Sequence, residues 1–198
     1  MEIRSFYEER AMPIIVDERT IEGYSTVFNK ESRIMFDPQR KRFFIEIIRS
    51  SAVSESDFKN WDIKALMEHD KARLLARSFN GSGTLQLSID DYGVKYRFEA
   101  PETTEGNNAL VQVKRRDIFG SSFAYTANEK DNVTYTKRSD GLLIREVQKF
   151  DRMFDVSLVT DPAYFGTDVN VRSLDSYFEE LPDESYKKEV ESLRSLIN

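Results

Sequence analysis

The sequence predicts an α+β fold with a β-rich core, and three observations support this prediction. Residues 84–89 alternate between polar and apolar side chains, and residues 94–100 alternate again after an Asp-Asp-Tyr-Gly turn, which predicts a β-hairpin. Residues 104–116 carry apolar side chains about one helical turn apart, which predicts a helix. After Arg172 the apolar spacing becomes helical. The core is therefore expected to consist mostly of strands.

Further short runs complete the expected core. Apolar or alternating runs of strand length, bounded by turn residues, predict additional strands. These runs are residues 23–28, 42–48, 63–67, 73–76, 121–126, 133–137, 142–147 and 154–159. The Asp140-Gly141 pair marks a second hairpin. Residues 50–61 are more polar and are interpreted as a short helix, whose inward side would be Ala52, Val53 and Phe58.

Two apolar stripes at helical spacing define a C-terminal tail. The first stripe contains Leu174, Tyr177, Phe178 and Leu181, and the second contains Tyr186, Val190, Leu193 and Ile197. Pro182 separates them. We therefore divide the chain into a main domain, residues 1–172, and an amphipathic helical tail, residues 173–198. The tail is a candidate docking element, but it can equally pack against its own domain.

The composition argues against several classes of protein. The 198 residues carry a net charge of −6, whereas dedicated nucleic-acid binders usually present a basic face. The chain has no cysteine, which removes disulfides, thiolate zinc sites and a cysteine nucleophile. No apolar run approaches the roughly 18 residues of a membrane span, and residues 1–10 lack the apolar stretch of a secretory signal. We expect a soluble, cytosolic protein that binds neither nucleic acid nor membrane.

His69 is the only histidine of the chain. Because zinc sites usually use several imidazoles, no metal is expected, and no cofactor is expected either. His69 is the first candidate for acid–base chemistry near neutral pH, since a free imidazole titrates in that range. It follows the apolar run 63–67, so we expect it at a strand end that leads into a loop. The alternative is an ordinary surface histidine.

Ser122 is the candidate nucleophile. It lies in Gly120-Ser121-Ser122-Phe123, and the glycine would permit a sharp turn at the start of the strand. Such a turn could expose the hydroxyl and direct successive backbone amides inward as part of an oxyanion hole. The alternative is a strand that begins with two routine serines. The glycine pattern of the nucleophile elbow is missing here.

Asp155 is the candidate acid. It shares one face of the predicted strand 154–159 with Ser157, whereas the apolar residues of that strand face the other way. An acid in this position could orient an imidazole through its Nδ1–H. The alternative is a polar face in solvent. Asp151 and Asp161 are weaker substitutes because they lie nearer the strand ends.

Four segments, in this order, resemble a known family. They are Ile21-Glu22-Gly23-Tyr24 with Val27-Phe28, then Met67-Glu68-His69-Asp70, then Gly120-Ser121-Ser122-Phe123-Ala124-Tyr125, and finally Asp155-Val156-Ser157-Leu158-Val159-Thr160-Asp161-Pro162-Ala163-Tyr164. The family is that of the prohead proteases of tailed phages with the HK97-type capsid. In its pattern, a histidine in an Asn/Glu-His-Asp context matches His69, a serine directly before an aromatic matches Ser122, and an acid before Pro-Ala matches Asp155. Glutamate is the usual acid, and aspartate is one methylene shorter.

The resemblance implies a fold and a function. The fold would be that of the herpesvirus assemblin-like serine proteases, with a barrel-like β core wrapped by helices, and it allows a homodimer. The function would be that of a serine endopeptidase with His69, Ser122 and Asp155 as its catalytic residues. It would cleave scaffold segments of the phage major capsid protein, and itself, inside the assembling prohead in the host cytoplasm. The alternatives are a non-catalytic capsid-assembly or scaffold protein with the same fold, a small esterase and, more remotely, a metal hydrolase.

Overall fold

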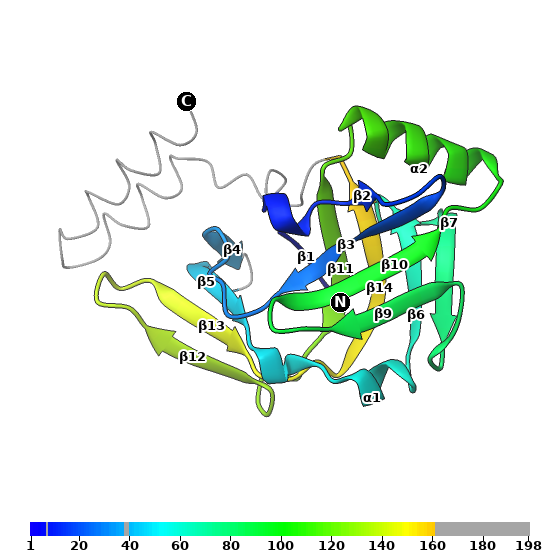
Figure 1. The fold of residues 1–198 in the computed structure, drawn as a ribbon. Helices are drawn as coiled ribbons and strands as arrows, with labels where there is room; N and C mark the ends of the chain where they lie inside the picture. Colours follow the sequence, from blue (N-terminus) through cyan, green and yellow to red (C-terminus); the bar gives the residue numbers. More distant parts are fainter. Residues whose placement is uncertain (7, 38–39, 161–198) are drawn as a thin grey trace.

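The structure is a computed structural model that describes residues 1–6, 8–37 and 40–160 of the chain. Within these residues the chain forms three β-sheets and two α-helices (Figure 1). The predicted α+β class with a β-rich core is therefore confirmed. The described residues contain no helix that is long and apolar enough to cross a membrane.

The largest sheet has six strands and carries the candidate site. In spatial order its strands are β1 (Glu2–Phe6), β11 (Gly120–Thr126), β14 (Arg152–Val159), β6 (Asp62–Met67), β7 (Asp70–Phe79) and β8 (Ser82–Gly83). All neighbours are antiparallel except β14 and β6, which run parallel. The parallel pair brings the carboxyl ends of β14 and β6 to the same edge of the sheet.

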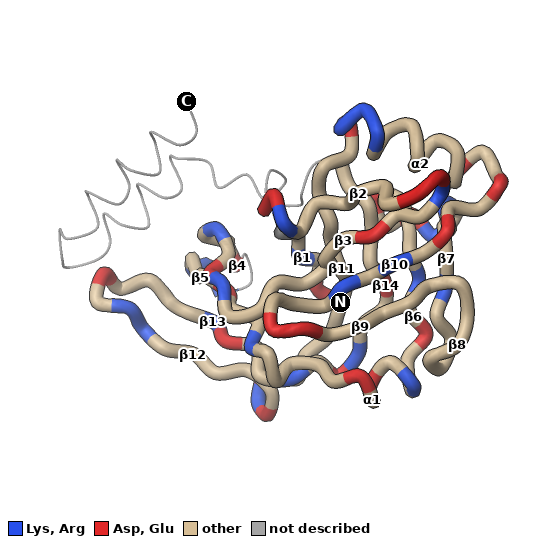
Figure 2. Tube along the Cα trace, viewed as in Figure 1, with Lys and Arg blue, Asp and Glu red and all other residues tan. Residues whose placement is uncertain are grey.

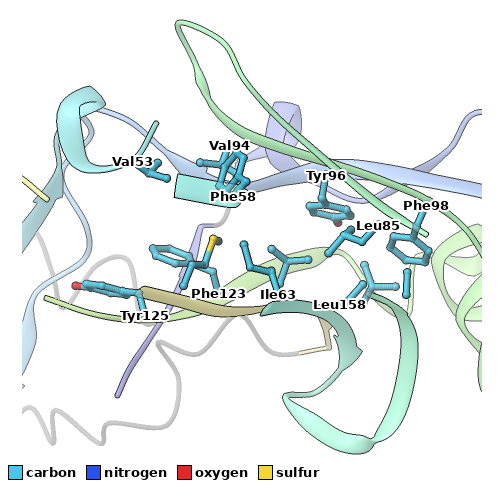
Figure 3. Close-up of a cluster of buried hydrophobic side chains, with 14 of the residues drawn as sticks. Val53, Phe58, Ile63, Leu85, Val94, Tyr96, Phe98, Phe123, Tyr125 and Leu158 are labelled. Carbon is cyan, nitrogen blue, oxygen red and sulfur yellow. The ribbon is translucent and has the colours of Figure 1, made fainter. Parts of the chain in front are cut away.

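A second sheet, which we call the β10 sheet, covers one face of the six-stranded sheet. Its strands are β2 (Ile14–Ile15), β3 (Thr20–Val27), β10 (Gly93–Glu99) and β9 (Leu85–Ile89). Side chains of both sheets meet between them (Figure 3): Ile63, Phe123 and Leu158 come from the six-stranded sheet, and Val94 and Tyr96 come from the β10 sheet. Burying these large apolar side chains, each worth about 1.5–3 kcal/mol, stabilises the packing of the two sheets.

A third sheet, which we call the β13 sheet, lies beside these two. Its strands are β12 (Val133–Lys137), β13 (Leu143–Val147), β5 (Arg42–Ile48) and β4 (Met35–Asp37). The predicted hairpin around Asp140-Gly141 joins β12 to β13, and Gly141 adopts a φ of 91° that favours glycine. β5 coincides with the predicted strand 42–48.

Four polar side chains, three of them buried, connect the β13 sheet to the six-stranded sheet. Glu46 of β5 accepts hydrogen bonds from Arg4 of β1 (2.6 Å) and from Tyr125 of β11 (3.0 Å), and it pairs with Arg145 of β13. The side chains of Glu46 and Arg145 are only 2% and 3% exposed. Burial disfavours the charged form of Glu46, but Arg4 and Arg145 outweigh burial and lower the pKa of this carboxyl. This cluster of charged side chains therefore links the two sheets.

The helices are short. The main one is α2 (Thr104–Arg115). Its N-terminal cap is Thr103, whose side chain accepts a hydrogen bond from the amide of Gly106 (3.3 Å), and its C-terminal cap is Arg116, which has a φ of 63°. α1 (Glu55–Phe58) and the 3₁₀ segments Glu9–Ala11 and Ser50–Ala52 are single turns. The predicted helix over 50–61 is thus reduced to two separate turns.

Two parts of the expected fold are wrong. The described strands form separate sheets and not one closed barrel, because β1, β8, β2, β9, β12 and β4 are free sheet edges in the strand order. Helices do not wrap the described core: α2 lies at one end of the two packed sheets, and α1 is a single turn (Figure 1). The predicted helical tail, residues 173–198, lies outside the described residues.

The charged residues do not gather on one side of the described chain. Lysine and arginine alternate with aspartate and glutamate over most elements (Figure 2). On the outer face of the β10 sheet, for example, Lys95 and Arg97 both pair with Glu22, at 2.9 and 3.0 Å. Such half-exposed pairs contribute little to stability, but they leave the surface charge locally balanced.

Candidate active site

A two-residue turn carries His69. Met67 at the end of β6 pairs with Asp70 at the start of β7, so Glu68 and His69 alone form the connection. Their φ values are 54° and 55°, a left-handed conformation that is uncommon for residues other than glycine. A tight hairpin turn of the type I′ kind requires positive φ at both of its central residues. His69 is therefore held by a hairpin, whereas the sequence predicted a strand end leading into a loop.

The turn is fastened to the end of β14. The amide of Glu68 donates to the carbonyl of Leu158 (2.9 Å), and the side chain of Glu68 accepts from the amide of Thr160 (2.7 Å). These contacts exist because β6 and β14 run parallel and end together, with Met67 opposite Leu158. They fix the position of the imidazole relative to β14.

The register of β11 and β14 places three polar side chains on one face of the six-stranded sheet. Ser122 lies opposite Ser157, and Ala124 lies opposite Asp155. Since side chains alternate along a strand, Ser122, Ser157 and Asp155 point away from the apolar core, toward which Phe123 points. This is the same face on which the His69 turn folds over the strand ends.

The three candidate residues form one chain of hydrogen bonds. Nε2 of His69 lies 2.6 Å from Oγ of Ser122, and Nδ1 lies 2.6 Å from Oδ1 of Asp155. An ionised carboxylate can only accept, so the Nδ1–H donates to Asp155 and leaves Nε2 free to accept the proton of Ser122. The shorter aspartate therefore reaches the imidazole directly.

The site is buried. The Ser122 residue is 0% exposed and Asp155 is 6% exposed, while the side chain of His69 is 16% exposed. A low-dielectric environment strengthens the electrostatic attraction between imidazole and carboxylate. Burial also means that a peptide carbonyl can reach the Ser122 hydroxyl only after neighbouring chain moves.

A second acceptor competes for the hydroxyl proton of Ser122. The carbonyl oxygen of Arg4, in β1, lies 2.9 Å from Oγ of Ser122. A serine hydroxyl has one proton, so it can point either to Arg4 or to His69. Only the second orientation prepares the oxygen for proton transfer to the imidazole.

The expected turn before Ser122 is absent from this region. Gly120 is already the first residue of β11, and Ser122 lies inside the strand, which pairs with β1 on one side and β14 on the other. The suggestion that a turn here directs amides into an oxyanion hole is therefore wrong. The serine is instead presented from a strand in the interior of the sheet.

Other candidates from the sequence lie elsewhere. Ser121 faces the core, where its hydroxyl contacts that of Tyr96 (2.8 Å). Asp151 is exposed and accepts a hydrogen bond from Asn132 (2.7 Å), and Asp161 lies outside the described residues. Sequence reasoning missed one residue at the site: Ser157, whose Oγ lies 2.9 Å from Oδ1 of Asp155. Its position two residues after Asp155, on the same strand face, was the available signal.

A hydroxyl, an imidazole and a carboxylate in this order of contact form the arrangement that serine hydrolases use. The comparison with known families agrees: the model of the caudovirus prohead serine proteases matches residues 7–180, and the chain belongs to this family. The match includes all three residues and extends past Arg172. No curated protein and no solved structure matches the chain.

Membership places the protein in a defined setting. The family consists of serine proteases of the phage prohead, which links the chain to capsid maturation and to contact with capsid proteins. The site of action of the family is the assembling capsid in the host cell.

Proposed function

We propose that the protein is a serine endopeptidase that removes scaffold segments from the phage major capsid protein, and cleaves itself, during prohead maturation. Ser122 is the nucleophile, His69 the general base and Asp155 the acid that orients His69. The observation that carries the proposal is the pair of 2.6 Å contacts that joins these residues across 53 and 86 positions of the chain. A homodimer is compatible with this function.

The geometry supports an acyl-transfer mechanism. Oγ of Ser122 attacks the peptide carbonyl carbon while its proton passes to Nε2 of His69. The C–N bond then breaks, the proton moves from Nε2 to the leaving amine, and an ester to Ser122 remains. Water attacks this ester, again giving its proton to Nε2, and the serine leaves with that proton. Asp155 stays ionised and stabilises the imidazolium. Acid–base help of this kind contributes roughly 10²–10⁴ in rate.

One observation is also compatible with a second candidate function. The complete burial of Ser122 suits a non-catalytic capsid-assembly protein that keeps the protease fold. It equally suits a protease that is restrained until it is enclosed in the prohead, because an enzyme active too early would destroy the capsid protein before assembly. The two candidates differ in whether the capsid protein is shortened.

Co-expression with the major capsid protein of the same phage tests the proposal. We expect the wild type to trim the capsid protein, which gel electrophoresis and mass spectrometry would show. Ser122→Ala should abolish trimming, whereas the matched control Ser121→Ala should retain it, because the Ser121 hydroxyl contacts Tyr96 and not His69. If Ser122→Ala trims the capsid protein and Ser121→Ala does not, the nucleophile is Ser121 and not Ser122. An intact capsid protein with the wild type would favour the non-catalytic alternative.

A further inference from the structure

Ser157 lies at the centre of the hydrogen-bonded chain. It sits in the middle of the sheet, on β14, directly opposite Ser122 of β11 and opposite Leu66 of β6. It is 1% exposed. Its Oγ lies 2.9 Å from Oδ1 of Asp155 and 3.2 Å from Nδ1 of His69. One hydroxyl therefore touches both partners of the imidazole–carboxylate contact.

The direction of these hydrogen bonds follows from the donors that are present. The carboxylate of Asp155 accepts only, so the single proton of Ser157 goes to Oδ1. A lone pair of Ser157 Oγ then faces the Nδ1–H of His69, which is shared between Oδ1 at 2.6 Å and Oγ at 3.2 Å. The three atoms form a closed triangle in which each contact limits the movement of the others.

The carboxylate needs this restraint. The terminal torsion of an aspartate side chain is broad, so its rotamer alone does not fix the plane of the two oxygens. Oδ1 of Asp155 receives the hydrogen bonds from both His69 and Ser157. Removing the second donor would let the carboxylate turn, and Oδ1 would leave the line of the Nδ1–H.

We propose that Ser157 is a positioning residue of the catalytic site: it holds Asp155 Oδ1 in line with His69 Nδ1, and thereby holds Nε2 toward Ser122. The proposal rests on the proposed function, since it concerns the same three residues. Ser157 touches no reacting atom and acts through Asp155 and His69. It is distinct from a buried serine that only satisfies its own hydroxyl, because it contacts both members of the pair.

Two isosteric variants separate the hydroxyl from the packing. Ser157→Thr keeps the hydroxyl, whereas Ser157→Val has nearly the same shape without it. Threonine and valine are both β-branched and suit a strand, so the two variants carry the same steric cost in this buried position. Thermal unfolding of both variants shows whether they fold equally well. Ser121→Ala serves as the control for loss of a buried hydroxyl of the same sheet that does not contact His69.

The first measurement is the rate at which a fluorophosphonate labels Ser122. We expect Ser157→Val to label on the order of 10-fold or more slowly than Ser157→Thr, because small misplacement of a catalytic group is costly. Ser121→Ala should label like the wild type. Equal rates for the Thr and Val variants, both folded, would overturn the proposal.

The second measurement does not need activity. His69 is the only histidine, so a ring proton held between Nδ1 and Asp155 gives one low-field proton NMR signal that needs no assignment. We expect the signal in the wild type and in Ser157→Thr, and its loss or a marked shift in Ser157→Val. An unchanged signal in the Val variant would contradict the positioning role. If the wild type is not labelled and also leaves the co-expressed capsid protein intact, the proposed enzyme function fails, while the NMR comparison still decides the role of Ser157.

Discussion

Nε2 of His69 lies 2.6 Å from Oγ of Ser122, although 53 positions of the chain separate the two residues. Three features of the fold produce this contact: the two-residue turn between β6 and β7, the parallel pairing of β6 with β14, and the register of β14 against β11. Each feature positions only part of the site, and none of them lies in a chain segment that contains both His69 and Ser122.

Replacing Asp155 by asparagine should nearly abolish cleavage while leaving the fold intact. The amide has the same shape but does not stabilise the imidazolium, and it favours the wrong tautomer of His69. The corresponding change in a well-studied serine protease lowers kcat by about 10⁴. The rate of capsid-protein trimming, or of fluorophosphonate labelling, measures the effect. Asp151→Asn is the matched control, since Asp151 contacts Asn132 at the surface, and it should be neutral. Cleavage by Asp155→Asn at the wild-type rate would show that Asp155 takes no part in the mechanism.

Changing Glu68 tests the strained turn. In Glu68→Val, a β-branched residue must adopt the left-handed conformation at φ 54°, at a cost of roughly 1–2 kcal/mol, whereas Glu68→Gly adopts it freely. Both variants lose the side-chain contact to Thr160, so their difference isolates the backbone. Urea unfolding should show the glycine variant to be more stable by about that amount, and the valine variant should label more slowly at Ser122. Equal stability of the two would mean that the turn is not left-handed in solution.

Removing Glu46 should strongly destabilise the protein. Glu46→Ala removes the common partner of Arg145, whose side chain is 3% exposed, and of Arg4, whose side chain is 12% exposed. Loss of one member of a buried ion pair costs about 3–5 kcal/mol, and we expect the lower end of this range because Glu2 still pairs with both arginines and Glu129 with Arg145. Glu22→Ala is the control, because Glu22 pairs with the half-exposed Arg97, and a pair of that kind contributes about 1 kcal/mol or less. The free energy of unfolding, measured with denaturant, should therefore fall several-fold more in Glu46→Ala than in Glu22→Ala. Similar losses would show that the ion pairs of Glu46 stabilise the protein no more than the exposed pairs of Glu22 do.

Stability should fall as the pH is lowered below the ordinary range of carboxyl groups. The pKa of Glu46 is lower in the folded protein than in the unfolded chain, owing to Arg4 and Arg145. A group of this kind stabilises the fold above its unfolded pKa, near 4.3, and the contribution disappears as the pH falls through the folded pKa. Asp62 behaves in the same way: Arg77 and Lys64 lower its pKa to about 2, so its contribution is lost between about pH 4 and 2.

Unfolding free energies measured from about pH 6 down to about 2 would test this dependence. Glu46→Gln should flatten the acid limb of the curve, since the titrating group is gone. Asp62→Asn should flatten it less, because Asp62 is partly exposed and solvent screens its pairs. An acid limb that is the same in Glu46→Gln and in the wild type would show that Glu46 does not titrate with folding.

Deleting residues 181–198 should impair packaging of the protease while sparing cleavage. This segment follows the matched family region and carries the second apolar stripe, Tyr186, Val190, Leu193 and Ile197. An apolar stripe at helical spacing can dock on a partner such as the capsid scaffold. Counting protease copies in purified proheads measures packaging, and trimming of purified capsid protein measures cleavage. Normal packaging of the shortened chain would show that this stripe is not needed for packaging.

Several elements could be predicted because their signals are local. The strand 42–48 and the hairpin formed by residues 84–89 and 94–100 follow from alternation and turn residues, and α2 follows from apolar spacing. The strands β2, β4 and β8 were missed because they contain only two or three residues, too few to show alternation. β1 was missed because it pairs with β11, which lies far away in the chain. For the same reason the barrel-like closure and the wrapping helices, taken from a resemblance, could not be checked from the pattern.

The amino-acid sequence by itself determined which groups are available: one imidazole, a pair of serines after Gly120, and one acid on a strand that alternates polar with apolar residues. It could not determine their distances, because contact across a sheet depends on register, and a shift by one residue turns every side chain to the other face. The tertiary structure alone decided that Ser122 and not Ser121 meets His69, that Asp155 reaches Nδ1, and that Ser157 joins them. Strand pairing is the physical reason, since it sets long-range neighbours that no local pattern records.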